Sequence, residues 1–261
     1  MSLRSDLHSH SSEFSGDASS TMEEMILAAI EGGLERICIT DHVDYDPNYD
    51  DSIPFDAERY TRAIETMRER YGDQIEILKG VEVGEAHRYP KEYEELLKGD
   101  YDMIIASIHY INLPMGIHWT ANEGKAIFTF AVDRIYRRYY EELKALVELG
   151  GFDVLGHFDH PRRYLLRLDH EDELIEEIIG MLVEKGIVPE INTSPLRKGV
   201  PETAPGKRIL DMYRKAGGKR VTVGADAHNT KDLAYGFDTA LQMAEGFTLG
   251  YFRKRKFIPL R

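Results

Sequence analysis

The chain has almost no cysteine and no long apolar run. Its 261 residues include one cysteine, Cys38, so neither an internal disulfide nor a cysteine-based zinc site can form. Cys38 lies inside an apolar run, where we expect a small buried hydrophobic residue. No stretch approaches the ~18 consecutive apolar residues of a transmembrane helix. Residues 1–5 lack the apolar core of a signal peptide, so we expect a cytoplasmic protein.

Positive charge is also scarce. There are 33 Lys and Arg residues against 46 Asp and Glu, which gives a formal net charge of −13. Such a surface repels a phosphate backbone, so we expect no nucleic-acid partner. If some of the acidic side chains bind divalent cations, the metal-bound protein is less negative than this formal charge states.

Seven short apolar runs alternate with segments of helical periodicity that mostly end at glycine. The expected strands cover 6–10, 37–39, 75–83, 103–109, 154–157, 187–192 and 221–228. The expected helices include one capped by Ser20 with Glu23 three residues on, then 57–71, 91–98, 125–149, 171–185 and 207–215. Residues 238–261 offer a further helix and a basic tail, whose Arg253-Lys254-Arg255-Lys256 we expect to be a solvated edge.

Strand–helix alternation of this kind predicts a parallel α/β sheet. An open doubly wound sheet is one form, and it usually concentrates its site at one switch point. Here ligand-type residues follow nearly every strand, and the length is close to the ~250 residues typical of a (β/α) barrel. We therefore expect a barrel, and residues 1–261 as a single domain.

The first strand carries the strongest signal, Asp6-Leu7-His8-Ser9-His10. Alternate residues of a strand share one face, so the three polar side chains point the same way. Two imidazoles backed by a carboxylate suit a metal ion. Two partly exposed histidines near a flexible start are an equally good interpretation of this stretch alone.

The rest of the chain favours the metal site, because further ligand-type residues recur at strand ends. The set comprises His8, His10, His42, Glu82, His109, His157, Asp226 and His228, with Asp17 in the loop after the first strand. Each alone could be a hydrogen-bonded buried histidine, a salt-bridging acid or a helix cap, but those interpretations do not predict the recurrence. Strand ends of a barrel converge at one mouth. Nitrogen and carboxylate ligands suit zinc, manganese or iron, and nine exceed the needs of one ion, so we expect two or three. The other histidines, His87, His118, His160 and His170, are expected in loops or at the surface, with His118 and His160 near the mouth.

The motif set resembles the PHP (polymerase and histidinol phosphatase) superfamily over essentially the whole chain. The motifs are Asp6-x-His8-x-His10, Thr40-Asp41-His42, Gly80-Val81-Glu82-Val83, Ser107-Ile108-His109, Gly156-His157 and Gly224-Ala225-Asp226-Ala227-His228. The stretches 157–163 and 191–198 are similar to the monofunctional histidinol-phosphate phosphatase branch.

The resemblance implies a distorted (β/α)7 TIM-like barrel with a trinuclear metal centre. His8, His10, Glu82 and Asp226 would bind the first metal, Glu82 would bridge to a second completed by His109 and His157, and Asp17, His42 and His228 would bind the third. Some family members have histidine in place of Asp17, which leaves the third metal's identity and affinity open. The implied activity is hydrolysis of L-histidinol phosphate to L-histidinol and phosphate, in histidine biosynthesis, by in-line attack of a metal-bound hydroxide held by Glu82, His8, His10 and Asp226. A bridged metal pair is independently suited to this chemistry, because it activates water and grips phosphoryl oxygens.

Substrate binding needs further groups. We expect Arg197, with Arg162 or Arg163, to bind phosphate, since a guanidinium matches phosphate oxygens. The loops 43–55 and 111–124, with Asp44, Tyr45 and Trp119, are long enough to cover the site.

Four other functions compete with this one. A PHP phosphoesterase for other small phosphates or nucleotides differs only in substrate. An amidohydrolase-type barrel also has H-x-H on its first strand, but it typically needs a bridging lysine or glutamate after a middle strand and a lone aspartate late in the chain. Here Glu82 comes early and Asp226 is paired with His228. A polymerase proofreading module conflicts with the charge of −13, and a non-catalytic domain conflicts with the near-complete ligand set.

Overall fold

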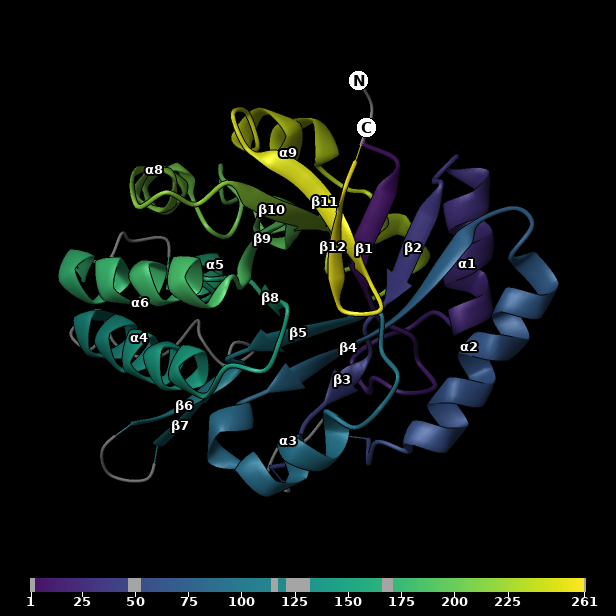
Figure 1. The fold of residues 1–261 in the computed structure, drawn as a ribbon, viewed down its shortest axis with the longest axis horizontal. Helices are drawn as coiled ribbons and strands as arrows, with labels where there is room; N and C mark the ends of the chain where they lie inside the picture. Colours follow the sequence, from purple (N-terminus) through teal and green to yellow (C-terminus); the bar gives the residue numbers. More distant parts are fainter. Residues whose placement is uncertain (1–2, 47–52, 114–116, 121–131, 166–170, 261) are drawn as a thin grey trace.

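Seven parallel strands alternate with helices in the computed structural model, which describes residues 3–46, 53–113, 117–120, 132–165 and 171–260 (Figure 1). The strands are β1 (Ser5–Ser9), β2 (Arg36–Ile39), β4 (Glu76–Gly84), β5 (Met103–Ser107), β8 (Val154–Leu155), β9 (Val188–Asn192) and β10 (Arg220–Gly224). Each pairs in parallel with the next in this order. All seven expected strands and the parallel α/β architecture are confirmed.

The last of these strands returns to the first. Just beyond β10, Ala227 donates its N–H to His8 O, and Ala227 O accepts from His10 N–H at 2.9 Å. Gly224 makes this approach possible, because a Cβ there would overlap the Cβ of His8. The seven strands thus form a ring that closes at the carboxyl ends of β1 and β10.

Helices cover the outside of the ring (Figure 1). The longer ones are α1 (Met22–Glu31), α2 (Ala57–Tyr71), α3 (Pro90–Leu96), α4 (Val132–Leu149), α6 (Asp172–Lys185), α8 (Lys207–Lys215) and α9 (Phe237–Met243). Short turns of helix follow several strands, namely η1 (Ala86–Arg88), α5 (Arg162–Leu165), α7 (Ser194–Arg197) and η4 (Thr230–Asp232). Among the described helices, none has the length and apolar character that crossing a membrane requires.

The cap of α1 lies one residue later than expected. Thr21, not Ser20, accepts the N–H of Glu24, and the Glu24 carboxylate accepts the N–H of Thr21 in return. Ser20 and Glu23 have the same spacing but serve other partners: Ser20 accepts the N–H of Thr230, and Glu23 accepts from the Tyr71 hydroxyl.

The segment expected as the loop 111–124 contains an antiparallel hairpin, β6 (Tyr110–Leu113) with β7 (Ile117–Thr120). A short strand, β3 (His42–Val43), also pairs with β4. The expected helix 125–149 is described from Val132 onward, and its residues 125–131 lie outside the described part of the chain.

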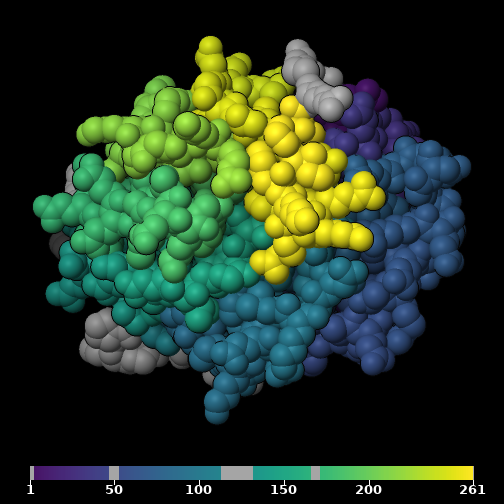
Figure 2. Space-filling view, in the orientation of Figure 1, coloured from purple at the N-terminus to yellow at the C-terminus, as the bar shows by residue number. Residues whose placement is uncertain are grey.

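A second hairpin, β11 (Thr248–Arg253) with β12 (Lys256–Pro259), closes the amino-terminal end of the ring. Its Tyr251 and Phe252 join the cluster that fills the ring interior, with Leu7, Cys38, Leu78, Met103, Ile105, Val154 and Val188. This cluster confirms Cys38 as a buried hydrophobic residue. Figure 2 shows the hairpin, in yellow, across the middle of one face.

The basic turn of this hairpin was expected to be a solvated edge, and that is wrong in part. Arg255 pairs with Asp153 and donates to Gly151 O at 2.6 Å. Lys254 N donates to the Asp102 carboxylate at 3.1 Å. These acids precede β5 and β8, so the turn is attached to the strand starts, opposite the predicted site.

Candidate metal centre

His8 and His10 project into the ring from the end of β1. Both are fully buried, and their ring centroids lie 5.0 Å apart. Asp6 does not join them. Its carboxylate accepts the N–H groups of Ala225 at 2.9 Å and Ala234 at 2.8 Å. Asp6 therefore attaches β1 to the segment after β10, and burial raises its pKa to about 6.

Glu82, on β4, lies in the middle of the site and is buried. Its two oxygens face different imidazoles. Oε2 lies 3.2 Å from His8 Nε2, 3.2 Å from His42 Nδ1 and 3.6 Å from His10 Nε2. Oε1 lies 3.0 Å from His157 Nε2 and 3.3 Å from His109 Nε2. This division is what a carboxylate bridging two cations requires.

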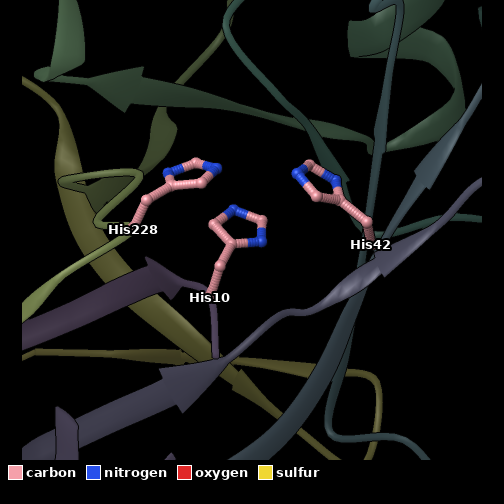
Figure 3. Close-up of side chains that lie close together, drawn as sticks. All are labelled: His10, His42 and His228. Atoms are coloured by element: carbon pink, nitrogen blue, oxygen red, sulfur yellow. The ribbon is translucent and has the colours of Figure 1, made fainter. Parts of the chain in front are cut away.

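A second carboxylate, Asp226, faces the β1 histidines from the end of β10. Its Oδ1 lies 3.5 Å from His10 Nε2 and 3.9 Å from His8 Nε2. The rings of His42 and His228 both lie next to that of His10, with centroid distances of 4.2 and 4.3 Å, and they are 5.8 Å from each other (Figure 3).

Asp17 completes this side of the site. One of its oxygens lies 3.0 Å from His228 Nε2, and the other lies 3.6 Å from His42 Nε2. The structure therefore brings all nine sequence-predicted ligands together.

The residues fit divalent cations. Three ligand histidines have buried ring nitrogens without a hydrogen-bond partner among the described residues: His8 Nε2, His10 Nε2 and both nitrogens of His42. Leaving buried polar atoms unpaired costs free energy that a bound cation would offset. Three groups made up of the predicted ligands alone offer ligand atoms within 4.8 Å of one another: His8–His10–Glu82, His42–Glu82–His109 and His10–His42–His228.

The acids and histidines of the site shift one another's pKa values. Burial opposes ionisation of Glu82, but the charge of His8 outweighs it and holds the pKa of Glu82 well below its usual range. Burial opposes ionisation of Asp226 as well, but Arg163 and His8 hold its pKa well below the usual range. Burial also disfavours the charged form of His8 and His42, but the facing carboxylates raise both pKa values well above 6.5. Burial and the neighbouring histidines instead lower the pKa of His10.

Sequence reasoning missed the groups that orient these ligands. Glu190, on β9, is buried and lies 2.7 Å from His8 Nδ1, which leaves Nε2 toward Glu82. A carboxylate on the far nitrogen of a ligand histidine fixes its tautomer and orientation. For His10, Nδ1 lies 3.5 Å from Ser15 Oγ, which donates to Asp41. The sequence did offer one signal for Glu190: it lies two residues before Asn192 on the same strand, so both side chains point to the same face.

His109 has its own carboxylates. Its Nδ1 lies 3.5 Å from Asp44 Oδ1, and its backbone N–H donates to Glu85 at 2.5 Å. Gly84 leaves room for this arrangement, because a Cβ there would overlap the Asp44 carboxylate. Beside the centre, Asp44 also lines a hollow of about 520 Å³ with Tyr45, Phe55 and other residues.

The three predicted phosphate-binding arginines occupy different positions. Arg163 donates from Nη2 to Asp226 Oδ2 at 2.6 Å and also contacts Ser194. Arg162 pairs with Glu202 at 2.6 Å. Arg197 donates to the carbonyls of Ala225 and Asp226 at 2.6 and 2.8 Å. Only Arg163 therefore touches the side chain of a predicted ligand.

Among the other histidines, His160 lies near the mouth as expected, with its ring centroid 4.5 Å from that of His157, but it is buried rather than at the surface. His87 lies elsewhere and pairs with Glu142. His170 and the side chains of His118 and Trp119 lie outside the described part of the structure.

Comparisons with known proteins follow the same motifs. The family model described as "PHP domain" matches residues 6–194. A "Probable histidinol-phosphatase" of Thermotoga maritima is 29% identical over 251 residues, 94% of this chain and 93% of that protein. A "Histidinol-phosphatase" of Lactococcus lactis is 28% identical over 236 residues, covering 87% and 84%. The crystal structure of L. lactis histidinol phosphate phosphatase with zinc, L-histidinol and phosphate superposes with a TM-score of 0.80 at 25% identity, over 98% of this chain and 100% of that one.

Proposed function

Because this chain belongs to the PHP domain family, we propose that it is a metal-dependent phosphomonoesterase that hydrolyses L-histidinol phosphate to L-histidinol and phosphate, a reaction of histidine biosynthesis. The observation that carries the proposal is the buried Glu82 with five imidazoles divided between its two oxygens. The L. lactis relative, whose structure holds zinc, L-histidinol and phosphate, supports the substrate.

The same geometry supports three divalent cations of zinc, manganese or iron. The first would be held by His8, His10, Glu82 and Asp226, the second by Glu82, His109 and His157, and the third by Asp17, His42 and His228. Bound cations of this kind supply a water of lowered pKa and neutralise charge on phosphoryl oxygens.

The protein's own residues hold this arrangement in place. Glu190 and the Ser15–Asp41 pair keep the imidazoles of His8 and His10 turned toward Glu82. The ring closure between β1 and β10 brings Asp226 and His228 to the same point. We further propose that residues 1–261 form one domain, because the site draws ligands from both ends of the chain.

We propose that Arg162, Arg163 or Arg197 binds the phosphate of the substrate. Arg163 is the strongest candidate, because its guanidinium contacts Asp226 and its Nε has no hydrogen-bond partner among the described residues. Replacement of Arg163 by Met is expected to raise KM and weaken inhibition by inorganic phosphate more than Arg162→Met does. Equal effects would remove the distinction.

The deciding experiment is phosphate release from L-histidinol phosphate, p-nitrophenyl phosphate and nucleoside monophosphates, with manganese or zinc supplied. We expect kcat/KM for L-histidinol phosphate to exceed the others by about 100-fold, roughly 2.7 kcal/mol of transition-state discrimination. Comparable rates on all of them would favour the second candidate, a PHP phosphoesterase for other small phosphates or nucleotides.

A further inference from the structure

Asp44 is a buried carboxylate with an incomplete set of partners. It follows β3 at the carboxyl end of the ring, and its side chain is 3% exposed. His109 Nδ1 lies 3.5 Å from Oδ1, and neither oxygen accepts a hydrogen bond of ordinary geometry from the other residues that the structure describes. Burying a carboxylate without partners costs free energy of folding, and a bound cation would offset that cost.

A second carboxylate lies next to Asp44. An oxygen of Asp44, an oxygen of Glu85 and a ring nitrogen of His109 all lie within 4.8 Å of one another. The Oε1 of Glu85 accepts the N–H groups of His109 and Tyr110, at 2.5 and 3.1 Å. The position therefore places two carboxyl groups behind a single imidazole, and burial raises the pKa of Glu85 to about 7.

His109 has only one ring donor to offer this pair. Its Nε2 faces Glu82, 3.3 Å away, so only Nδ1–H is left for Asp44 Oδ1. A metal ion on Nδ1 would require the imidazole to lose both of its protons, which neutral histidine does not do. The site instead suits an organic cation that brings several N–H donors, namely a primary ammonium group.

We propose that Asp44, supported by Glu85, binds the ammonium group of the alcohol half of the substrate, so that the enzyme selects phosphomonoesters with an amino group on the carbon next to the ester carbon. This inference rests on the proposed function. L-histidinol phosphate has this structure, since its amino-bearing carbon is bonded directly to the carbon that carries the ester oxygen. His109 separates the two positions, with one nitrogen toward the metal centre and the other toward Asp44.

Three substrates test the inference on the metal-loaded protein: L-histidinol phosphate, 3-(imidazol-4-yl)propyl phosphate, which lacks the amine, and L-phenylalaninol phosphate, which lacks the imidazole. We expect wild type to favour L-histidinol phosphate over the deamino ester by at least about 30-fold in kcat/KM. In Asp44→Asn this preference should fall to below about 3-fold. The kcat/KM ratio of L-histidinol phosphate to L-phenylalaninol phosphate, which both carry the amine, should stay within about twofold of its wild-type value.

Asp41→Asn is the matched control. Asp41 is also a buried carboxylate that supports a ligand histidine, but through Ser15 and His10. It should lower turnover of all three esters in proportion. If Asp44→Asn does the same, Asp44 only positions His109 and the inference is wrong. A loss confined to the esters that carry the imidazole would overturn it as well.

Two further measurements keep the inference testable. Gly84→Ala displaces the Asp44 carboxylate without removing its charge, so it should also lower the amine preference if Asp44→Asn fails to fold. Calorimetric binding of L-histidinol does not depend on turnover: Asp44→Asn should weaken it at least about tenfold, even if the phosphatase proposal fails. Unchanged L-histidinol binding would overturn the inference, whereas absent phosphate release with intact binding would count against the phosphatase alone.

Discussion

Glu82 sets the charge balance of the site, because five imidazoles face its two oxygens. We expect Glu82→Ala and His10→Ala to lower kcat/KM by at least about 1,000-fold and to reduce the bound metal, with the fold intact by circular dichroism. His87→Gln, a histidine paired with Glu142 outside the site, should keep its activity and metal. Wild-type activity in a folded Glu82→Ala protein would remove the metal-centre hypothesis.

Glu190 should act through His8 rather than on the substrate. Glu190→Gln keeps the shape but removes the negative charge 2.7 Å from His8 Nδ1, so metal affinity should fall by about 10–100-fold in chelator competition. Much of the lost activity should return at saturating metal. Exposed Glu176 offers the control, Glu176→Gln. An affinity equal to wild type would show that His8 needs no carboxylate behind it.

At the scale of elements, the contact between β10 and β1 depends on a missing side chain. Gly224→Ala would place a Cβ against His8, and such overpacking should lower the free energy of unfolding by about 1–3 kcal/mol, measured by denaturant titration. Gly180→Ala is the control, because Gly180 lies in α6 with open space around it. It should instead stabilise the protein by about 0.5–1 kcal/mol. Equal effects would mean that the ring closes less tightly than the structure indicates.

The β11–β12 hairpin should matter for stability and not for turnover. Arg255→Met leaves the buried Asp153 without its arginine, so the free energy of unfolding should fall by about 1–3 kcal/mol. Because this contact lies at the strand starts, kcat/KM should stay within about twofold of wild type. A large loss of kcat/KM at wild-type stability would connect the hairpin to the site.

For the whole molecule, pH should act mainly through metal binding. In the metal-free protein the pKa values of His8, His42 and His109 lie well above 6.5, so these rings keep protons at neutral pH. Their contribution to stability is full below 6.5 and is lost as pH rises through the raised values. Metal ligation needs the neutral rings and must release those protons.

The metal-induced gain in Tm should therefore grow between about pH 6 and pH 8. Calorimetry in buffers of different ionisation enthalpy should show proton release on metal binding at neutral pH. Depletion of metal with a chelator should abolish turnover and reverse the gain. A gain that is equal at both pH values would contradict the assigned protonation of the three rings.

The sequence was informative about the ligands because each sits at the end of a local strand pattern. The alternation of residues 6, 8 and 10 and the acid or histidine after each apolar run are visible without knowing the fold. The orienting groups are not, since His8 and Glu190 are 182 residues apart and meet only through the sheet. Likewise, Arg197 follows β9 as expected, but its contacts with the carbonyls of Ala225 and Asp226 depend on the left-handed turn at Asp226, where φ is 53°.

The ring closure also sets the order of events during synthesis. Asp6 and Ala225, which join the first and seventh strands of the ring, are 219 residues apart, and the ligands His8 and His10 meet Asp226 and His228 across that junction. A ribosome has therefore made most of the chain before the two halves of the site can meet. A nascent fragment that ends before β10 lacks Asp226 and His228, so the complete set of nine ligands can assemble only after the seventh strand of the ring has been made.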